Sequence, residues 1–321
     1  MNTCSSVSRR GLLAVGALAL PVAALAQRRP PLALCTVAMV GDMARSVAGP
    51  ALRTETLIGE GVDPHLFRPT RNDVARLLAA DIILANGHRL EGRMGDVLER
   101  ARAAGKPVLL VAEALPRDRL RAHPDYPDAA DPHVWMDPTL WSEAAGALPA
   151  LFARLLPAEA AGFDQRLAAF RDRLARLDAY GRRVLGSIPE GQRLLVTAHD
   201  AFAYFGARYG LEVDSIQGLS TESEANLARI EALVARLAER RVPAVFAESS
   251  VPDRAVRALI EGVGTRGQRV ALGGKLFADA MGRPGTYEGT YEGMLDHNFT
   301  TIARALGGSA PPRGLDGRLA A

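Results

Sequence analysis

Two copies of the tripeptide Asp-Pro-His present a histidine directly after a proline, and they end at His65 and His133. Proline fixes its own φ angle and holds the residue before it out of the helical region. Each histidine therefore follows a rigid turn, which lowers the entropy cost of ordering a metal ligand. The repeated tripeptide favours two imidazoles that bind one metal ion.

Two further side chains complete this candidate site. His199 ends one predicted strand, and Asp279 follows the last predicted strand of the chain. Three neutral imidazoles and one carboxylate suit a borderline divalent ion. Such a site carries a net positive charge, which a neighbouring acid would offset. Glu248, at the end of another predicted strand, is the candidate for a carboxylate that supports the ligands from behind.

Each of these residues also has an ordinary structural interpretation. A single histidine at a strand end is more often structural than a ligand, and a loop aspartate such as Asp279 usually caps a helix. Glu248 with the serines after it also fits a strand end followed by a helix cap. The sequence leaves open whether Glu248 or His88 contacts the ion. His123 and His297 are expected to face solvent or a helix surface.

Strands alternate with helices along the chain, which predicts parallel sheets covered by helices on both faces. The predicted strands cover residues 32–40, 55–58, 81–85, 107–111, 193–197, 211–217, 244–247 and 268–272. The predicted helices cover residues 41–49, 70–80, 92–104, 201–209, 222–240, 252–263 and 288–306. In such folds ligands bind beyond the carboxyl ends of the strands. The candidate ligands fall in the turns and loops there.

Residues 163–188 differ from the rest, because apolar side chains recur there at helical spacing and charges fill the other face. This pattern predicts one long helix. The economical architecture is α/β, with two lobes joined by one long rigid helix and the metal site in the cleft between them. We expect an export signal at 1–26, an N-terminal lobe at 27–160, the linking helix at 161–189 and a C-terminal lobe at 190–321.

The first 26 residues have the pattern of a bacterial export signal. Arg9 and Arg10 precede an apolar run that ends in small residues before Gln27. The paired arginines favour the twin-arginine route, and the mature chain is expected in the periplasm. No cysteine follows the apolar run at the cleavage point, so a lipid anchor is not expected. Cys35, the one cysteine of the mature chain, is predicted to be a buried strand thiol.

The balance of charge argues against a nucleic-acid partner. The 39 basic residues, less Arg9 and Arg10, leave 37 against 36 acidic residues, and the two signs are interleaved. Aromatic residues make up 5% of the chain, with Trp135 and Trp141 as the two tryptophans. That composition offers little for stacking a sugar or a peptide.

Together these motifs resemble the metal-binding solute-binding proteins of bacterial ABC importers, the cluster A-I class that captures manganese, zinc or iron. The resemblance covers essentially the whole mature chain. It is carried by residues 61–65 (GVDPH), 86–87 (NG), 90–92 (LEG), 131–138 (DPHVWMDP), 197–202 (TAHDAF), 246–250 (FAESS) and 276–282 (LFADAMG). It implies that His65, His133, His199 and Asp279 are the metal ligands and that a long, stiff helix between the lobes limits their movement.

Two departures from the family pattern bear on the metal. Members specialised for zinc often carry a histidine-rich acidic loop before the second ligand, whereas residues 115–132 contain only His123. Many manganese-specialised members have glutamate at the third ligand, where this chain has His199. The pattern resembles the subgroup with three histidines and one aspartate, which both metals fit. We expect zinc to bind more tightly than manganese, by the usual order of divalent ions.

The resemblance implies a monomeric receptor that captures one Mn²⁺ or Zn²⁺ and delivers it to a membrane permease, without catalysis. The competing interpretations are a zinc-dependent hydrolase that uses the same site and a receptor for an organic solute. A hydrolase requires an open coordination position and a general base, and the His-Glu-x-x-His motif is absent from the sequence.

Overall fold

The computed structural model describes Met1 and residues 29–124, 126–222 and 226–320. The predicted export signal, apart from Met1, lies outside the described residues and stays a prediction. Within the described ranges, none of the helices has both the length and the apolar character needed to cross a membrane.

The N-terminal lobe is built on a sheet of four parallel strands in the order β2-β1-β3-β4. These strands are β1 (Leu32–Cys35), β2 (Arg53–Thr56), β3 (Ile82–Ala85) and β4 (Val108–Leu110). Every residue of β3 is buried, as are Ala33, Leu34 and Cys35 of β1, which explains their continuous apolar sequence. Helices connect the strands: α1 (Ala38–Ala48), α2 (Arg71–Ala79) and α3 (Gly95–Ala103).

The C-terminal lobe contains two parallel strand pairs, β5 with β6 and β7 with β8, and β5 lies beside β7. The strands are β5 (Leu194–Thr197), β6 (Glu212–Ser215), β7 (Ala244–Glu248) and β8 (Ala271–Leu276). Their helices are α7 (Ala203–Tyr209), α8 (Leu227–Arg240) and α9 (Arg254–Thr265). The fold is therefore α/β with two lobes and parallel strands, as predicted.

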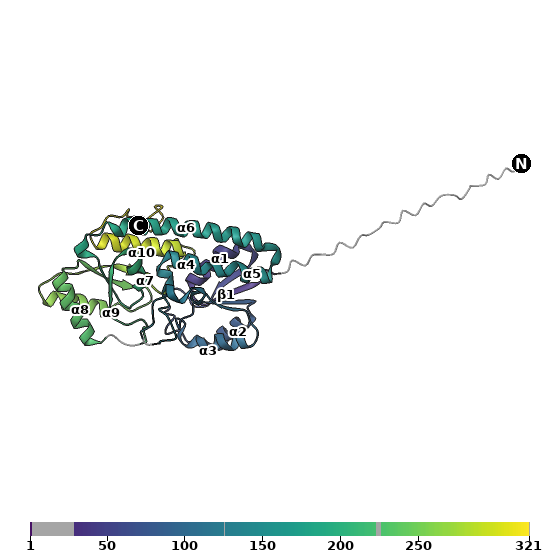
Figure 1. Cartoon of the computed structure of the whole chain (residues 1–321), viewed down its shortest axis with the longest axis horizontal. Coiled ribbons are helices and arrows are strands. Elements are labelled where there is room, and N and C mark those ends of the chain that lie inside the picture. Colours follow the sequence, from purple (N-terminus) through teal and green to yellow (C-terminus); the bar gives the residue numbers. More distant parts are fainter. Residues whose placement is uncertain (2–28, 125, 223–225, 321) are drawn as a thin grey trace.

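One long helix, α6 (Ala160–Gly186), runs along one edge of both lobes, with α10 (Tyr291–Ala305) beside it (Figure 1). On the N-terminal side α6 packs on α1, α4 (Pro138–Ala144) and α5 (Leu148–Leu155). On the C-terminal side it packs on α7 and α10. The predicted long helix is confirmed, whereas α4 and α5 were not predicted.

Two predicted boundaries were wrong for identifiable reasons. The apolar run 32–40 is not one strand, because β1 ends at Cys35 and α1 already begins at Ala38. Both pieces are buried, and a continuous apolar run does not distinguish a buried strand from a buried helix. The last strand was predicted at 268–272 but lies at Ala271–Leu276. It contains Gly273 and Gly274, and glycine is depleted in strands, so the pattern did not indicate one there.

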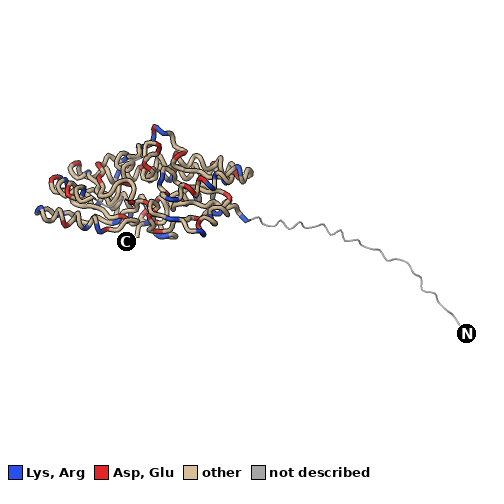
Figure 2. Tube along the Cα trace, turned by 90° about the horizontal axis from the view of Figure 1, so that it is seen from below, with Lys and Arg blue, Asp and Glu red and all other residues tan. Residues whose placement is uncertain are grey.

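Charged residues of both signs are interspersed over the folded part of the chain (Figure 2). Many form ion pairs across elements. Arg208 of α7, for example, contacts Asp178 of α6 at 2.7 Å. Asp178 is largely buried, so the pair fastens α6 to the C-terminal lobe.

Candidate metal centre

Four buried side chains meet where the two lobes face each other: His65, His133, His199 and Asp279. The Nε2 atoms of His65, His133 and His199 lie 3.3, 3.4 and 3.1 Å, respectively, from a carboxylate oxygen of Asp279. One ligand atom from each residue lies within 4.8 Å of all the others. Four ligands about 2.0–2.1 Å from a tetrahedral ion are about 3.3 Å apart, so these distances fit one ion.

Among the residues that the structure describes, the atoms that face one another in this cluster lie close together but form no hydrogen bonds. They are the three Nε2 atoms and both carboxylate oxygens of Asp279. Buried polar atoms are nearly always hydrogen-bonded, so five unsatisfied atoms at one point indicate a site that binds a ligand. Nitrogen and carboxylate oxygen are the ligands that a borderline divalent cation takes.

The two Asp-Pro-His turns present the two clustered histidines of the N-terminal lobe. In each turn the aspartate accepts a hydrogen bond from the backbone N–H of the histidine, at 2.8 Å for Asp63 and His65 and at 2.9 Å for Asp131 and His133. Asp131 also lies 2.8 Å from Nδ1 of His133. A carboxylate can only accept, so Nδ1 carries the proton and Nε2 faces the cluster.

The two clustered side chains of the C-terminal lobe follow strand ends. His199 lies just beyond β5, and Asp279 lies just beyond β8. Glu248, the last residue of β7, is buried and accepts from the backbone N–H of His199 at 2.9 Å. Its other carboxylate oxygen lies 2.5 Å from Nδ1 of His199. Glu248 therefore stands behind His199 and is not among the four residues that meet.

The electrostatics of the cluster follow from burying opposite charges together. Burial alone would lower the pKa of His133, but the carboxylates of Asp279 and Asp131 raise it to about 9. Burial likewise opposes a charged His199, yet Glu248 and Asp279 raise its pKa well above the usual range. Burial would raise the pKa of Asp279, and the two histidines hold it well below its ordinary value. A cation that binds to Nε2 of these histidines must therefore displace protons.

A loop from Asn86 to Gly92 lies against both Asp-Pro-His turns. The side-chain amide of Asn86 donates to the carbonyl of Pro132 at 3.0 Å. Gly92 has φ of +46°, and a Cβ atom there would overlap the backbone oxygen of His65. A glycine is needed at this position both for the left-handed backbone and for the close approach.

The same loop is held in shape by the buried carboxylate of Glu91. It accepts from the backbone N–H of Asn86 at 2.6 Å and of Gly87 at 3.2 Å, and from the hydroxyl of Thr36 at 2.7 Å. Sequence analysis used this loop for the family resemblance and left open whether its His88 contacts the ion, but it gave Glu91 and Gly92 no role at the site. The available signal was an acid within the glycine-flanked loop NGHRLEG.

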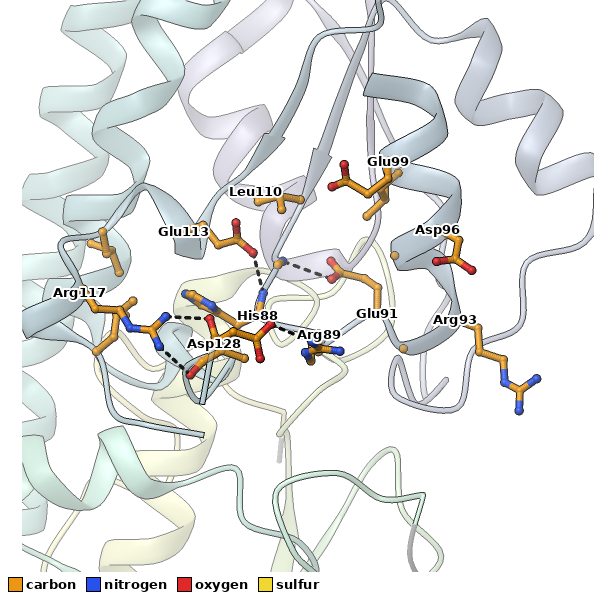
Figure 3. Close-up of a pocket in the computed structure, with 17 residues that line it drawn as sticks. His88, Arg89, Glu91, Arg93, Asp96, Glu99, Leu110, Glu113, Arg117 and Asp128 are labelled. Carbon is orange, nitrogen blue, oxygen red and sulfur yellow. Dashed lines mark hydrogen bonds and ion pairs between the residues drawn. The ribbon is translucent and has the colours of Figure 1, made fainter. Parts of the chain in front are cut away.

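The remaining histidines lie outside the cluster. His88 borders a cavity of about 880 Å³ that Glu113, Arg117 and Asp128 also line (Figure 3). Burial lowers its pKa, and its backbone N–H donates to Glu113 at 3.2 Å. His297 lies on α10 with Nε2 2.9 Å from the carbonyl of Lys275, which agrees with a helix surface.

The expectation for His123 was wrong. This histidine was expected to face solvent or a helix surface, but it is buried in the loop before the His133 turn. Its ring lies 4.8 Å from that of Tyr126. Packing of one irregular loop on itself leaves no periodic pattern in the sequence, so this burial could not be read there.

Comparisons with known proteins agree with this geometry. Residues 34–305 match the family described as zinc-uptake complex component A, periplasmic. The manganese-binding lipoprotein MntA of Bacillus subtilis is 42% identical over 271 residues, which are 84% of this chain and 88% of MntA. The zinc-binding protein TroA of Treponema pallidum is 44% identical over 276 residues, which are 86% of this chain and 89% of TroA.

The solved structure of periplasmic zinc-binding TroA from Treponema pallidum superposes on this fold with a TM-score of 0.83. The match covers 86% of this chain and 99% of that structure, at 44% sequence identity. The family match spans residues 34–305 and therefore includes the strand ends and turns that carry the four clustered side chains. The chain therefore belongs to the zinc-uptake component A family, the metal-binding solute-binding proteins of ABC importers.

Proposed function

We propose that this protein binds one divalent transition metal ion through His65, His133, His199 and Asp279 and delivers it to the membrane permease of an ABC importer. The observation that carries the proposal is the convergence of five buried, unsatisfied donor and acceptor atoms. Glu248 and Asp131 support the site by fixing the ring orientation of two ligands.

The ion that we propose is Zn²⁺ or Mn²⁺. Two relatives with more than 40% identity are named for different metals, one for zinc and one for manganese. Three nitrogen ligands favour Zn²⁺ over Mn²⁺ in affinity, so selectivity in the cell would rest on the availability of each ion and on its release to the permease. We further propose that the protein acts as a monomer in the periplasm after removal of residues 1–26.

The burial of the site supports capture of an ion over hydrolysis of a substrate. His133 and His199 have no exposed surface, and His65 and Asp279 are at most 5% exposed. A hydrolase must admit a substrate to a coordination position on the metal and place a general base beside it. A site this enclosed suits an ion that enters and leaves while the lobes or loops move.

The test is a competition titration of the metal-free chain from Gln27 onward, with Zn²⁺ and Mn²⁺ against a chromogenic chelator at neutral pH. We expect one site for either ion, with Zn²⁺ bound more tightly. Absence of binding by both ions would contradict the proposal and favour a receptor for an organic solute.

Variants locate the site within the same assay. His133→Ala and Asp279→Asn should each abolish tight binding, because each removes a buried ligand while the surrounding turn stays in place. His297→Ala is the matched control, since this histidine lies on α10 outside the cluster and should retain wild-type affinity. Wild-type affinity in both ligand variants would show that the metal binds elsewhere.

A further inference from the structure

Hydrogen bonds connect the His133 turn to the C-terminal lobe, which carries two of the other three clustered side chains. The hydroxyl of Tyr204 on α7 donates to the carbonyl of Asp131 at 3.1 Å. The indole N–H of Trp135 donates to the carbonyl of Ala278 at 3.0 Å, next to Asp279. The two bonds are made two residues before and two residues after His133. They therefore hold His133 to the lobe that carries His199 and Asp279.

The loop that carries His65 is held much less firmly. It connects β2 to α2, and residues 57–70 contain neither helix nor strand. Large apolar side chains on either side of the histidine are exposed, Val62 at 40% and Leu66 at 52%. Segments with little regular structure and exposed apolar side chains are those that open at low free-energy cost.

Apart from the contact of His65 with Asp279 in the cluster, one side-chain hydrogen bond among the described residues connects this loop to the opposite lobe, and Asp63 accepts it. One carboxylate oxygen of Asp63 accepts from the backbone N–H of His65 at 2.8 Å, and the other accepts from the hydroxyl of Thr221 at 2.5 Å. Thr221 is 8% exposed, so solvent competes little for this hydroxyl. A hydrogen bond to a charged acceptor is among the stronger ones in proteins, and this one is partly buried.

The segment before Thr221 is in turn tied to the turn that carries His199. The backbone N–H of Asp200 donates to the carbonyl of Gly218 at 3.2 Å, and that of Gln217 donates to the carbonyl of Ala198 at 2.9 Å. The chain of contacts from His65 through Asp63 and Thr221 thus ends beside another metal ligand.

We propose that the Thr221–Asp63 hydrogen bond is a latch that holds the His65 loop closed over the bound ion. This inference rests on the proposed function, since it concerns release from the same four-residue site. Opening the His65 loop removes one ligand and exposes the other three, and the Thr221 hydrogen bond must break for this to happen. Thr221 is a positioning residue, which acts on the ion through Asp63 and His65.

The experiment measures the rate at which Zn²⁺ leaves the chain from Gln27 onward after mixing with excess chelator. In Thr221→Val, which keeps the shape but lacks the hydroxyl, dissociation should be about tenfold faster, as expected for loss of one charged hydrogen bond. The association rate should change by less than about twofold, because the latch forms after the ion has entered. Thr221→Ser keeps the hydroxyl and should restore the slow rate.

Two controls separate a latch from damage to the site. Thr139→Val removes an equivalent hydroxyl-to-aspartate bond, 2.7 Å to Asp137, that stays within one lobe, and it should release Zn²⁺ at the wild-type rate. The visible spectrum of bound Co²⁺ reports the coordination geometry and should be the same in Thr221→Val as in the wild type.

Each failure has a distinct meaning. Wild-type dissociation from Thr221→Val would overturn the latch and leave the proposed function intact. An altered Co²⁺ spectrum would show that Thr221 shapes the closed site, which also overturns the latch. If the wild-type chain holds no Zn²⁺ at the start, the proposed function fails and the latch fails with it.

Discussion

Two of the three clustered histidines have a carboxylate on Nδ1, Asp131 behind His133 and Glu248 behind His199. Such a partner fixes the ring and the tautomer and makes Nε2 more basic toward a metal. Within the described residues His65 has no carboxylate on Nδ1, and its turn is held through the backbone by Asp63. The three clustered histidines therefore differ in how firmly they are held, and under the proposed function His65 is the one suited to leave the ion first.

Replacing Glu248 with glutamine should weaken metal binding while leaving the fold intact. Glu248 accepts two hydrogen bonds from His199, one on each oxygen, whereas glutamine has one acceptor oxygen and would face an N–H group with its amide NH₂. We expect the Kd for Zn²⁺ to rise about 10- to 100-fold, the usual effect of losing such a support. Chelator competition measures this affinity.

The matched control is Glu292→Gln, because Glu292 also accepts a hydrogen bond from a partner side chain but lies on α10, away from the cluster. It should bind Zn²⁺ like the wild type. An unchanged Kd in the Glu248 variant would mean that His199 is oriented by something else.

The residues that meet at the site could be picked out from the sequence, whereas the atoms that support them could not. Strand ends of parallel sheets meet at one edge, so His199, Asp279 and Glu248 could be placed near one another from topology alone. The aspartates of the two Asp-Pro-His turns were interpreted only as residues that the proline holds out of the helical region. Two supporting contacts could not be predicted: Asp131 accepts from Nδ1 of His133, and Asp63 accepts from Thr221. Both depend on side-chain directions and on the approach of the lobes, which no local sequence pattern records.

At the scale of elements, the loop Asn86–Gly92 sets the position of the His65 turn, and Gly92→Ala tests this. A methyl group at Gly92 would overlap the His65 carbonyl, and alanine is strained at φ of +46°. The turn must shift outward, so we expect Zn²⁺ affinity to fall at least about tenfold, since 1.4 kcal/mol of strain suffices. Isothermal titration of the metal-free chain measures the change.

Gly95→Ala provides the control for that experiment. Gly95 begins α3 three residues further on, and a Cβ atom there meets nothing within 4 Å. This variant should keep wild-type affinity and gain slightly in stability, because alanine favours a helix more than glycine does. Equal affinities in the two variants would contradict a positioning role for the loop.

Elements with strong local signals were predicted well. The long helix has sustained apolar spacing, and the helix after Thr70 begins with the capping box that Thr70 and Asp73 form. The start of α1 was misplaced because Gly41 lies inside the helix, where its missing side chain lets the helix approach Thr56 of β2. Gly41 serves tertiary packing, but in the sequence alone a glycine there indicates the start of a helix.

At the scale of the whole molecule, α6 and α10 form a shared support for both lobes (Figure 1). Gly181 of α6 faces the ring of Phe299 of α10 so closely that a Cβ atom would lie 2.8 Å from it. Because α6 packs on both lobes and lies this close to α10, we expect the pair to resist a wide hinge movement between the lobes. The boundaries proposed for the lobes, at 160/161 and 189/190, remain a prediction.

A buried acid joins the start of α10 to the N-terminal lobe and makes the stability of the molecule depend on pH. Asp42 of α1 is 7% exposed and accepts from the backbone N–H of Tyr291 at 3.2 Å. Burial, together with the nearby Glu292 carboxylate, raises its pKa from 3.8 to about 6. Between these two values the folded state binds a proton that the unfolded state has lost, so this group makes folding less favourable as pH rises.

Asp42→Asn removes this penalty, because the amide oxygen can still accept from Tyr291 and carries no charge to bury. A shift of about two pKa units corresponds to about 3 kcal/mol, which is the upper limit of the gain at pH 7.5. Chemical unfolding of the metal-free chain should show the variant more stable than the wild type at pH 7.5 and equal to it near pH 4. Asp164→Asn, on the exposed face of α6, should follow the wild type throughout. A gain that is the same at both pH values would show that packing, and not the charge of Asp42, limits the stability of this joint between the lobes.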